Sequence, residues 1–350
     1  MSSRLPVAVL GATGSVGQRF VQLLDQHPLF EVVALTSSDR RSGQPYGESC
    51  RWVLTDPMPE WAKTIRLSPT TPEDLHIPLV FSALPADIAR EVEPQFAQAG
   101  TMVCSNASSY RREADIPILL PEVNADHARL VEIQRRKRGW RGGIVTNPNC
   151  TSTGMTVVLK ALLDSFGVQK VFAVSMQAIS GAGYPGVPSM DILDNVIPYI
   201  GGEEEKVETE PLKMLGALQH DTIQPASFVI SAHTNRVAVS DGHTVCLSIE
   251  LVKKASLDEI AQVLQTYQAP TESQNLPSAP HPPIILRDEA DRPQPRLDRM
   301  SGKGMSTVVG RLRKDPIYDI KMVVLSHNTI RGAAGGSIYN AELLRSMGFI

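Results

Sequence analysis

Short apolar runs alternate with amphipathic segments over the first 150 residues of the chain. The runs predict strands at residues 6–10, 31–36, 79–83, 101–105 and 143–146. Between the first two runs, the segment from Gly17 to His27 carries Phe20, Leu23 and Leu24 at helical spacing. Strands that alternate with helices are typical of a parallel sheet with helices on both faces, so we expect an α/β, Rossmann-type doubly wound domain in this part.

The pattern changes after Cys150. A helix is expected over 153–165, and longer β-rich runs follow at 170–179, 227–240, 243–252, 306–312 and 320–326. Such runs favour an α+β domain with a mixed or antiparallel sheet. A Pro- and Ser-rich stretch at 269–283 is expected to be an exposed loop. The C-terminal segment returns to glycine-rich and then helical character, and we place this last helix against the first domain.

The length of 350 residues exceeds the usual size of one hydrophobic core and predicts two domains. We expect residues 1–150, completed by a C-terminal helix at 328–350, to form the first, and residues 151–327 to form the second. The formal net charge of -3 argues against nucleic acid and membrane surfaces as partners, since both attract a basic excess. Glycines interrupt the N-terminal apolar stretch, and no run reaches transmembrane length, so we expect neither a signal peptide nor a membrane span.

Three glycines mark a candidate dinucleotide site. Gly11, Gly14 and Gly17 lie between the first predicted strand and its helix, in VAVLGATGSVGQ. Glycine permits a tight turn and lets backbone N–H groups and the helix N-terminus approach a pyrophosphate, although a plain strand-to-helix link would look similar. At the end of the second strand, Ser38 and Arg40 favour the 2′-phosphate of NADP, while Asp39 leaves NAD open.

Four cysteines, Cys50, Cys104, Cys150 and Cys246, are scattered without paired spacing. This favours reduced thiols in a cytoplasmic protein over disulfides or a metal site. Cys150 follows a β-rich run and precedes a helix-forming stretch, where the helix dipole should lower the thiol pKa and favour the nucleophilic thiolate. Cys104 and Cys246 lie within apolar runs and are expected to be buried and inert, while Cys50 fits either environment.

A thiol nucleophile needs an acid/base partner, and histidine is the usual one near neutral pH. Seven of the eight histidines lie in contexts that favour surface or structural roles: His27, His76, His127, His220, His233, His281 and His327. His243 differs because Asp241 and Gly242 form a turn between two β-rich runs and hold the imidazole at a strand edge. Spacing alone leaves His243 as one candidate among eight.

Several separated motifs occur in one order along nearly the whole chain. They are GATGSVG at 11–17, SNASSYRREADIPILLPEVN at 105–124, NPNC at 147–150, QAISGAGYPGVPSMD at 177–191, GGEEEK at 201–206, NRVAVSDGH at 235–243, RPQPRLDR at 292–299 and NTIRGAAGG at 328–336. With these motifs the chain resembles aspartate-semialdehyde dehydrogenase, particularly the branch found in archaea and fungi.

The resemblance implies an NADP-dependent, phosphorylating enzyme with a glyceraldehyde-3-phosphate-dehydrogenase-like fold. Cys150 would attack the aldehyde of L-aspartate 4-semialdehyde, His243 would relay protons, and inorganic phosphate would cleave the thioester to L-aspartyl 4-phosphate. In biosynthesis the net flow is the reverse. Among further residues, the resemblance assigns oxyanion stabilisation to Asn149, orientation to Gln177, the α-carboxylate to Arg236, the ammonium to Glu203, and phosphate to Lys206 and Arg111.

The resemblance also extends the cofactor site beyond the first glycines. Its contacts to NADP would be Gly11, Thr13, Gly14, Ser15, Val16, Ser38, Arg40, Ser82, Leu84, Ser180, Gly181, Asn328 and Gly332. No metal site is expected. Family members assemble through the sheet of the second domain, so residues 151–327 are expected to be a catalytic and dimerisation domain in a homodimer or homotetramer.

Three alternatives share this fold. Malonyl-CoA reductase has the cysteine and the nucleotide loop but needs neither Asn149 nor the charged pair of Glu203 and Lys206. N-acetyl-γ-glutamyl-phosphate reductase acts on an acylated substrate without a free ammonium. A non-catalytic dinucleotide sensor would not need Cys150 and His243 together. Without the resemblance, the charged run at 203–206 would be interpreted as a solvated helix start.

Overall fold

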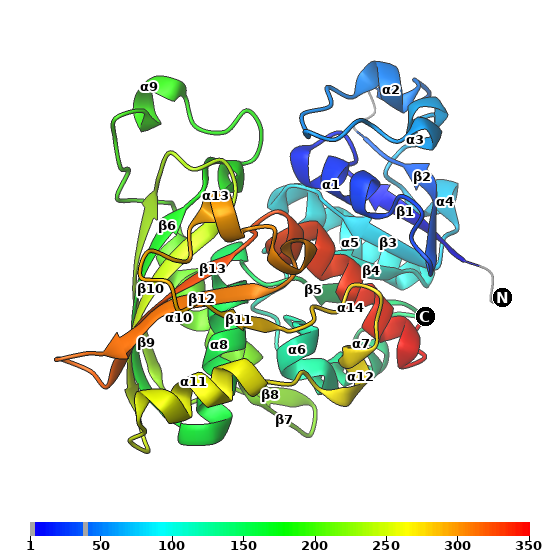
Figure 1. Ribbon diagram of the computed structural model, residues 1–350. Coiled ribbons are helices and arrows are strands. Elements are labelled where there is room, and N and C mark those ends of the chain that lie inside the picture. The colour runs from blue at the N-terminus through cyan, green and yellow to red at the C-terminus, as the bar shows by residue number, and fades with distance from the viewer. Residues whose placement is uncertain (1–3, 38–40) are drawn as a thin grey trace.

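The computed structural model describes residues 4–37 and 41–350. Figure 1 shows two units side by side, with the C-terminal helix returning to the first unit. The first unit is built on a parallel five-stranded sheet of order β2-β1-β3-β4-β5. Its strands are β1 (Leu5–Leu10), β2 (Phe30–Leu35), β3 (Leu79–Ser82), β4 (Met102–Ser105) and β5 (Gly143–Thr146). Each of the five predicted runs therefore coincides with a strand to within one residue at either end.

Helices cover both faces of this sheet, because alternate side chains of each strand point to opposite sides. Val7 and Val9 of β1 pack with helices α1 (Ser15–Leu23), α7 (Leu130–Arg138) and α14 (Gly335–Ser346). Ala8 and Leu10 pack on the other face with α5 (Ala86–Ala99). Shorter helices in the connections are α2 (Tyr46–Ser49), α3 (Glu60–Thr64), α4 (Pro72–Leu75) and α6 (Pro121–Asn124). The predicted doubly wound α/β unit is confirmed.

The second unit contains a mixed six-stranded sheet of order β11-β12-β13-β10-β6-β9. Its strands are β6 (Val168–Gln177), β9 (Val229–Arg236), β10 (His243–Leu251), β11 (Ile284–Leu286), β12 (Thr307–Lys314) and β13 (Ile320–Ser326). The β6·β9 and β11·β12 pairs are parallel, and the other pairs are antiparallel. Strands β7 (Ala217–Gln219) and β8 (Thr222–Gln224) form a separate hairpin.

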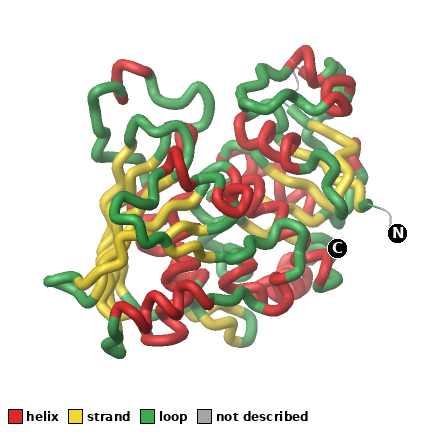
Figure 2. Tube along the Cα trace, in the orientation of Figure 1, coloured by secondary structure: helices red, strands yellow, loops and turns green. Residues whose placement is uncertain are grey.

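Three helices pack on one face of the second sheet and form a continuous apolar core with it (Figure 2): α8 (Cys150–Phe166), α10 (Glu203–Met214) and α11 (Leu257–Thr266). The remaining short helices are α9 (Ser189–Ile192), α12 (Thr271–Gln274) and α13 (Pro295–Asp298). On the opposite face Cys246 lies in register with Val174 and Val323, and all three are partly exposed. The expectation that Cys246 is buried is therefore wrong, because it belongs to the face away from the helices.

The Pro- and Ser-rich stretch at 269–283 is more ordered than the exposed loop expected from its composition. It contains α12 and is fastened to α14 at two points. The Tyr339 hydroxyl donates to the carbonyl oxygen of Ser273, and Ser278 donates through its backbone N–H and its hydroxyl to the buried carboxylate of Glu342. This stretch therefore helps to hold α14 against the first unit.

Among residues 4–37 and 41–350, no helix combines the length and the apolar character needed to span a membrane. The same part of the chain contains no group of three or more His, Cys, Asp or Glu side chains placed to hold a metal ion.

Candidate active site

Cys150 and His243 meet at the edge where the two units join. Cys150 is the first residue of α8, and His243 is the first residue of β10. The Cys150 Sγ lies 3.2 Å from the His243 Nε2, so residues 93 positions apart form the pair that the sequence suggested. The thiol lines a cavity of about 660 Å³ between the units.

A side-chain cap fixes the start of α8 at the nucleophile. Asn149 precedes the helix, and its Oδ1 accepts from the backbone N–H groups of Thr151 and Ser152 at 2.9 and 3.1 Å. These two N–H groups have no carbonyl partner within the helix, so the cap stabilises its first turn. Cys150 is thereby held on a rigid helical turn at the cavity wall.

The electrostatics of the pair differ from the expectation of a low thiol pKa. Burial, followed by the negative charge of Glu203, raises the pKa of Cys150 to about 12, against the opposing positive charges of Arg111 and Arg236. Burial and the positive charge of Arg236 lower the pKa of His243 to about 3. Desolvation therefore outweighs the helix dipole, and both groups are neutral near pH 7.

The backbone N–H of Ala178 donates to the Nδ1 of His243 at 3.0 Å. Nδ1 is therefore an acceptor, and the neutral ring carries its proton on Nε2, the nitrogen that faces Sγ. Gly181 packs directly against this ring. A Cβ at Gly181 would lie 2.7 Å from the Arg236 Nη1 and 3.1 Å from the His243 Nε2, so only glycine fits here without movement of the site.

Two further predicted site residues lie at the ends of neighbouring parallel strands, close to Cys150 and His243. Gln177 ends β6 and Arg236 ends β9, and the two residues lie opposite each other in the register of this pair. The Arg236 Nη1 donates to the carbonyl oxygen of Ala178 at 2.8 Å, which fixes the guanidinium beside the cavity. The Gln177 Nε2 donates to the Ser175 hydroxyl at 3.3 Å.

The three glutamates at the start of α10 have different surroundings, and only one of them faces the cavity. Glu203 is only 6% exposed and lines the cavity with Lys206. Its Oε1 accepts from the Asn149 Nδ2 at 2.7 Å, and its Oε2 lies 3.3 Å from the Lys206 Nζ. Glu204 accepts from a backbone N–H of β9, while Glu205 pairs with a surface arginine. Glu205 is solvated, as expected for a charged helix start, whereas Glu203 is the glutamate that faces the cavity.

Arg111 is 8% exposed and lines the cavity on the first unit's side. Its Nη1 donates to Glu210 at 2.9 Å and its Nη2 to the carbonyl oxygen of Asn106 at 3.0 Å. Glu210 also accepts from the backbone N–H of Asn149 at 2.6 Å. Sequence reasoning missed Glu210, whose one available signal is its place seven residues after Glu203 on the same helix face.

The glycine motif forms the expected tight turn between β1 and α1. Gly11 has a φ of 71°, and a Cβ there would meet the carbonyl oxygen of Ala83 at 2.9 Å. A Cβ at Gly17 would lie 2.3 Å from the carbonyl oxygen of Gly11. Helix α1 begins at Ser15 with no side-chain cap, which leaves its N-terminus available to an anion. The turn therefore fits a pyrophosphate, and Thr13 is partly exposed and Gly14 exposed at its rim.

The other predicted cofactor residues fall into three groups. Those that line the cavity with Cys150 are Val16, Leu84, Ser180, Gly181, Asn328 and Gly332. A Cβ at Gly332 would lie 2.8 Å from that of Cys150, so the turn before α14 packs tightly against the nucleophile. Ser82 is 0% exposed at the end of β3, and its role as a cofactor contact stays a prediction. Ser38 and Arg40 lie outside the described residues.

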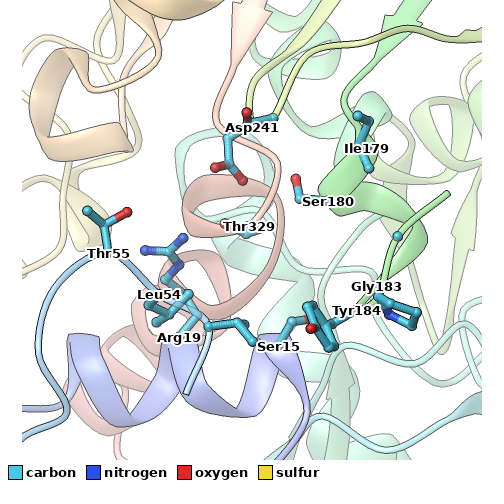
Figure 3. Close-up of a pocket in the computed structure, with 14 residues that line it drawn as sticks. Ser15, Arg19, Leu54, Thr55, Ile179, Ser180, Gly183, Tyr184, Asp241 and Thr329 are labelled. Atoms are coloured by element: carbon cyan, nitrogen blue, oxygen red, sulfur yellow. The ribbon is translucent and has the colours of Figure 1, made fainter. Parts of the chain in front are cut away.

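A second cavity of about 310 Å³ continues the cleft along α1 (Figure 3). It shares Ser180, Gly183 and Thr329 with the first cavity, and Ser15 lines it at the N-terminus of α1. Arg19 of α1 and Asp241 of the turn before β10 face it from the two units. The space beside the nucleophile therefore extends past the glycine turn.

Comparisons with known proteins cover nearly the whole chain. Residues 6–131 match the family described as semialdehyde dehydrogenase, NAD binding domain, and residues 159–331 match semialdehyde dehydrogenase, dimerisation domain. The chain is 51% identical to the aspartate-semialdehyde dehydrogenase of Archaeoglobus fulgidus, over 97% of this chain and 98% of the relative. It is 44% identical to that of Schizosaccharomyces pombe, over 98% of this chain and 99% of the relative. A crystal structure of aspartate semialdehyde dehydrogenase with NADP from Candida albicans is 42% identical and superposes with a TM-score of 0.91, covering 99% of this chain and 100% of that one.

Proposed function

The chain belongs to the aspartate-semialdehyde dehydrogenase family, and we propose that it catalyses the NADP-dependent reductive dephosphorylation of L-aspartyl 4-phosphate to L-aspartate 4-semialdehyde. This reaction serves the biosynthesis of lysine, threonine and methionine. The observation that carries the proposal is the 3.2 Å contact between the Cys150 Sγ and the His243 Nε2 at a cavity that also holds Arg236, Glu203, Lys206 and Arg111.

The charges around the nucleophile match the charges of this substrate. Arg236 would pair with the α-carboxylate, and Glu203 would accept from the α-ammonium. Arg111 and Lys206 would hold the phosphoryl group that leaves, or the inorganic phosphate that attacks in the reverse direction. Malonyl-CoA has no ammonium to meet Glu203, and a non-catalytic sensor would have no use for the thiol beside the imidazole.

In the biosynthetic direction, the Cys150 sulfur would attack the acyl carbon of L-aspartyl 4-phosphate. The new carbon–sulfur bond replaces the carbon–oxygen bond to phosphate, and a thioester forms. NADPH, when bound, supplies the hydride that reduces this carbon; the carbon–sulfur bond then breaks, the aldehyde leaves, and Cys150 regains its proton. The oxyanion formed at the attacked carbonyl would be stabilised by the Asn149 Nδ2, whose second hydrogen is not used by Glu203, and Gln177 would orient the acyl group.

His243 would exchange protons at a single nitrogen. Its Nε2 faces Sγ and carries the ring proton, because Nδ1 accepts from Ala178. To take the thiol proton at Nε2, the ring must give its own proton to a substrate oxygen, so the two transfers are coupled. Because both groups are neutral in the free protein, the thiolate forms during attack and does not wait as an ion pair.

For NADP, we propose that Gly11, Thr13, Gly14, Ser15 and Val16 hold the pyrophosphate and the adjoining ribose. Leu84, Ser180, Gly181, Asn328 and Gly332 would border the nicotinamide half beside Cys150. The Asn328 side chain already bridges two segments there, since its Nδ2 donates to the Ser180 hydroxyl at 2.8 Å. Ser38 and Arg40 would meet the 2′-phosphate.

We further propose that residues 1–150, with 328–350, form the cofactor-binding domain and that residues 151–327 form the catalytic and dimerisation domain. The placement of α14 in the core of the first unit and of α8 in the core of the second supports this division. A homodimer or homotetramer would use the partly exposed sheet face that includes Val174, Cys246 and Val323. Light scattering of the purified protein measures this, and a monomer would contradict it. The location is proposed to be cytoplasmic, in keeping with four free cysteines.

The proposed activity is tested by following NADPH formation from L-aspartate 4-semialdehyde, phosphate and NADP. A parallel reaction supplies malonyl-CoA and NADPH. We expect turnover of the semialdehyde only when phosphate is present, and loss of turnover in Cys150→Ser but not in the matched control Cys246→Ser. Turnover of malonyl-CoA without turnover of the semialdehyde would overturn the proposal.

A further inference from the structure

Four of the seven charged side chains of helix α10 lie at positions 203, 206, 210 and 213. Residues three and four positions apart lie on one face of a helix, so these four form a stripe. Glu203 and Lys206, at its beginning, line the cavity. Glu210 and Lys213, at its end, contact the segment of the first unit that carries Arg111. The last two residues have no role in the function proposed above.

Glu210 uses its two carboxylate oxygens on two different parts of the site. Its Oε1 accepts from the Arg111 Nη1 at 2.9 Å, and its Oε2 accepts from the backbone N–H of Asn149 at 2.6 Å. The side chain is 6% exposed, so little solvent screens either interaction. One buried carboxylate thus joins the candidate phosphate-binding arginine to the residue that caps the nucleophile's helix.

Lys213 holds the same arginine segment from another side. Its Nζ donates to the carbonyl oxygens of Arg111, Glu113 and Ile116 at 2.7, 2.6 and 2.7 Å. These three bonds use all the hydrogens of an ammonium group. Because Lys213 belongs to α10 and the carbonyl groups belong to the first unit, the contact connects the two units at the segment that carries Arg111.

We propose that Glu210 is a positioning residue that keeps Arg111 and the start of α8 in a fixed relation, and that Lys213 fixes the segment on which Arg111 is carried. The inference rests on the proposed function, in which Arg111 meets the phosphoryl group while Cys150 attacks the carbon beside it. Arg111 and Cys150 then keep a fixed distance, although Arg111 lies in the first unit and helix α8, which begins at Cys150, packs in the core of the second. Near-attack geometry depends on this kind of fixed distance.

The first test is Glu210→Gln, with Glu205→Gln as the matched control. The glutamine keeps the size of the side chain but presents an NH2 to one of two donors and removes the counter-charge of Arg111. We expect kcat/KM for phosphate to fall about 10- to 100-fold, as for loss of a buried charged hydrogen bond. Glu205 lies on the same helix with an exposed side chain paired to Arg112, so its variant should change kcat/KM by less than about 3-fold.

A double variant distinguishes a positioning role of Glu210 from a merely structural one. In Arg111→Met, the further change Glu210→Gln should no longer alter the KM for phosphate, because it acts on phosphate through Arg111. The rate of Cys150 alkylation by iodoacetamide should still change, because Glu210 also holds the Asn149 backbone. Alkylation needs no substrate, so it tests Glu210 even if the wild-type protein fails to turn over the semialdehyde.

Lys213→Met provides an independent variant if Glu210→Gln does not fold. It should raise the KM for phosphate and leave the alkylation rate of Cys150 unchanged, since Lys213 contacts the Arg111 segment and not α8. A folded Glu210→Gln protein with wild-type KM, kcat and alkylation rate would overturn the proposal. An unchanged KM for phosphate in Lys213→Met would overturn the part that concerns Lys213.

Discussion

Gly181→Ala is a sharp test of the site because the three atoms nearest to the added methyl group all belong to Arg236 and His243. The Cβ would lie 2.7 Å from the Arg236 Nη1, 3.0 Å from the His243 Cε1 and 3.1 Å from the His243 Nε2. Reaching an ordinary contact of 3.4 Å requires these atoms to recede by about 0.3 to 0.7 Å. The φ of Gly181 is not in the left-handed region, so alanine introduces no backbone strain.

A displacement of this size would disturb the 3.2 Å contact between the Cys150 Sγ and the His243 Nε2 and the placement of the Arg236 guanidinium. We expect kcat/KM for the semialdehyde to fall about 10- to 100-fold, because misplacement of reacting groups by about 1 Å costs about 100-fold. Thermal unfolding should change little. Gly201→Ala is the matched control, since the nearest atom to its Cβ is 3.8 Å away. Wild-type kcat/KM in Gly181→Ala, at unchanged melting temperature, would refute the described arrangement.

Three further outcomes follow from the electrostatics of the pair. The alkylation rate of Cys150 should keep rising with pH through the alkaline range, because the thiolate fraction grows until pH reaches the raised pKa of about 12. A plateau of this rate near neutral pH would reveal a preformed ion pair between Cys150 and His243. Glu203→Gln should speed this alkylation, because Glu203 raises the pKa of Cys150, and it should raise the KM for the semialdehyde because the ammonium partner is removed. Slower alkylation or an unchanged KM would contradict the assignment. Nitrogen-15 NMR of His243 should show the proton on Nε2 in the resting protein, and a proton on Nδ1 would rule out the contact with Ala178.

The first sheet could be predicted from sequence because its parallel strands are buried on both faces and therefore read as continuous apolar runs. The start of α8 was predicted three residues too late. Thr151, Ser152 and Thr153 are polar, yet all three are buried in the first turn of the helix. The asparagine that caps the helix was the better signal, since Asn149 supplies acceptors to the free N–H groups.

The protonation state of the Cys150 thiol could not be predicted from the neighbouring residues in the sequence. Position at a helix N-terminus suggested a low thiol pKa, but the pKa depends on how deeply the two units bury the thiol, and no local pattern gives that depth. Glu210 was missed for a related reason. Its partners Arg111 and Asn149 lie 99 and 61 residues away, so the contacts exist only after the units have packed together.

The proposed function requires that Cys150 forms a thioester that phosphate, and not water, resolves. Mass spectrometry of peptides from protein incubated with L-aspartate 4-semialdehyde and NADP, without phosphate, tests it directly. We expect an acyl group on Cys150 alone among the four cysteines, and its rapid loss when phosphate is added. An unmodified Cys150, an acyl group on another cysteine, or equally fast loss without phosphate would contradict a thioester on Cys150 that phosphate resolves.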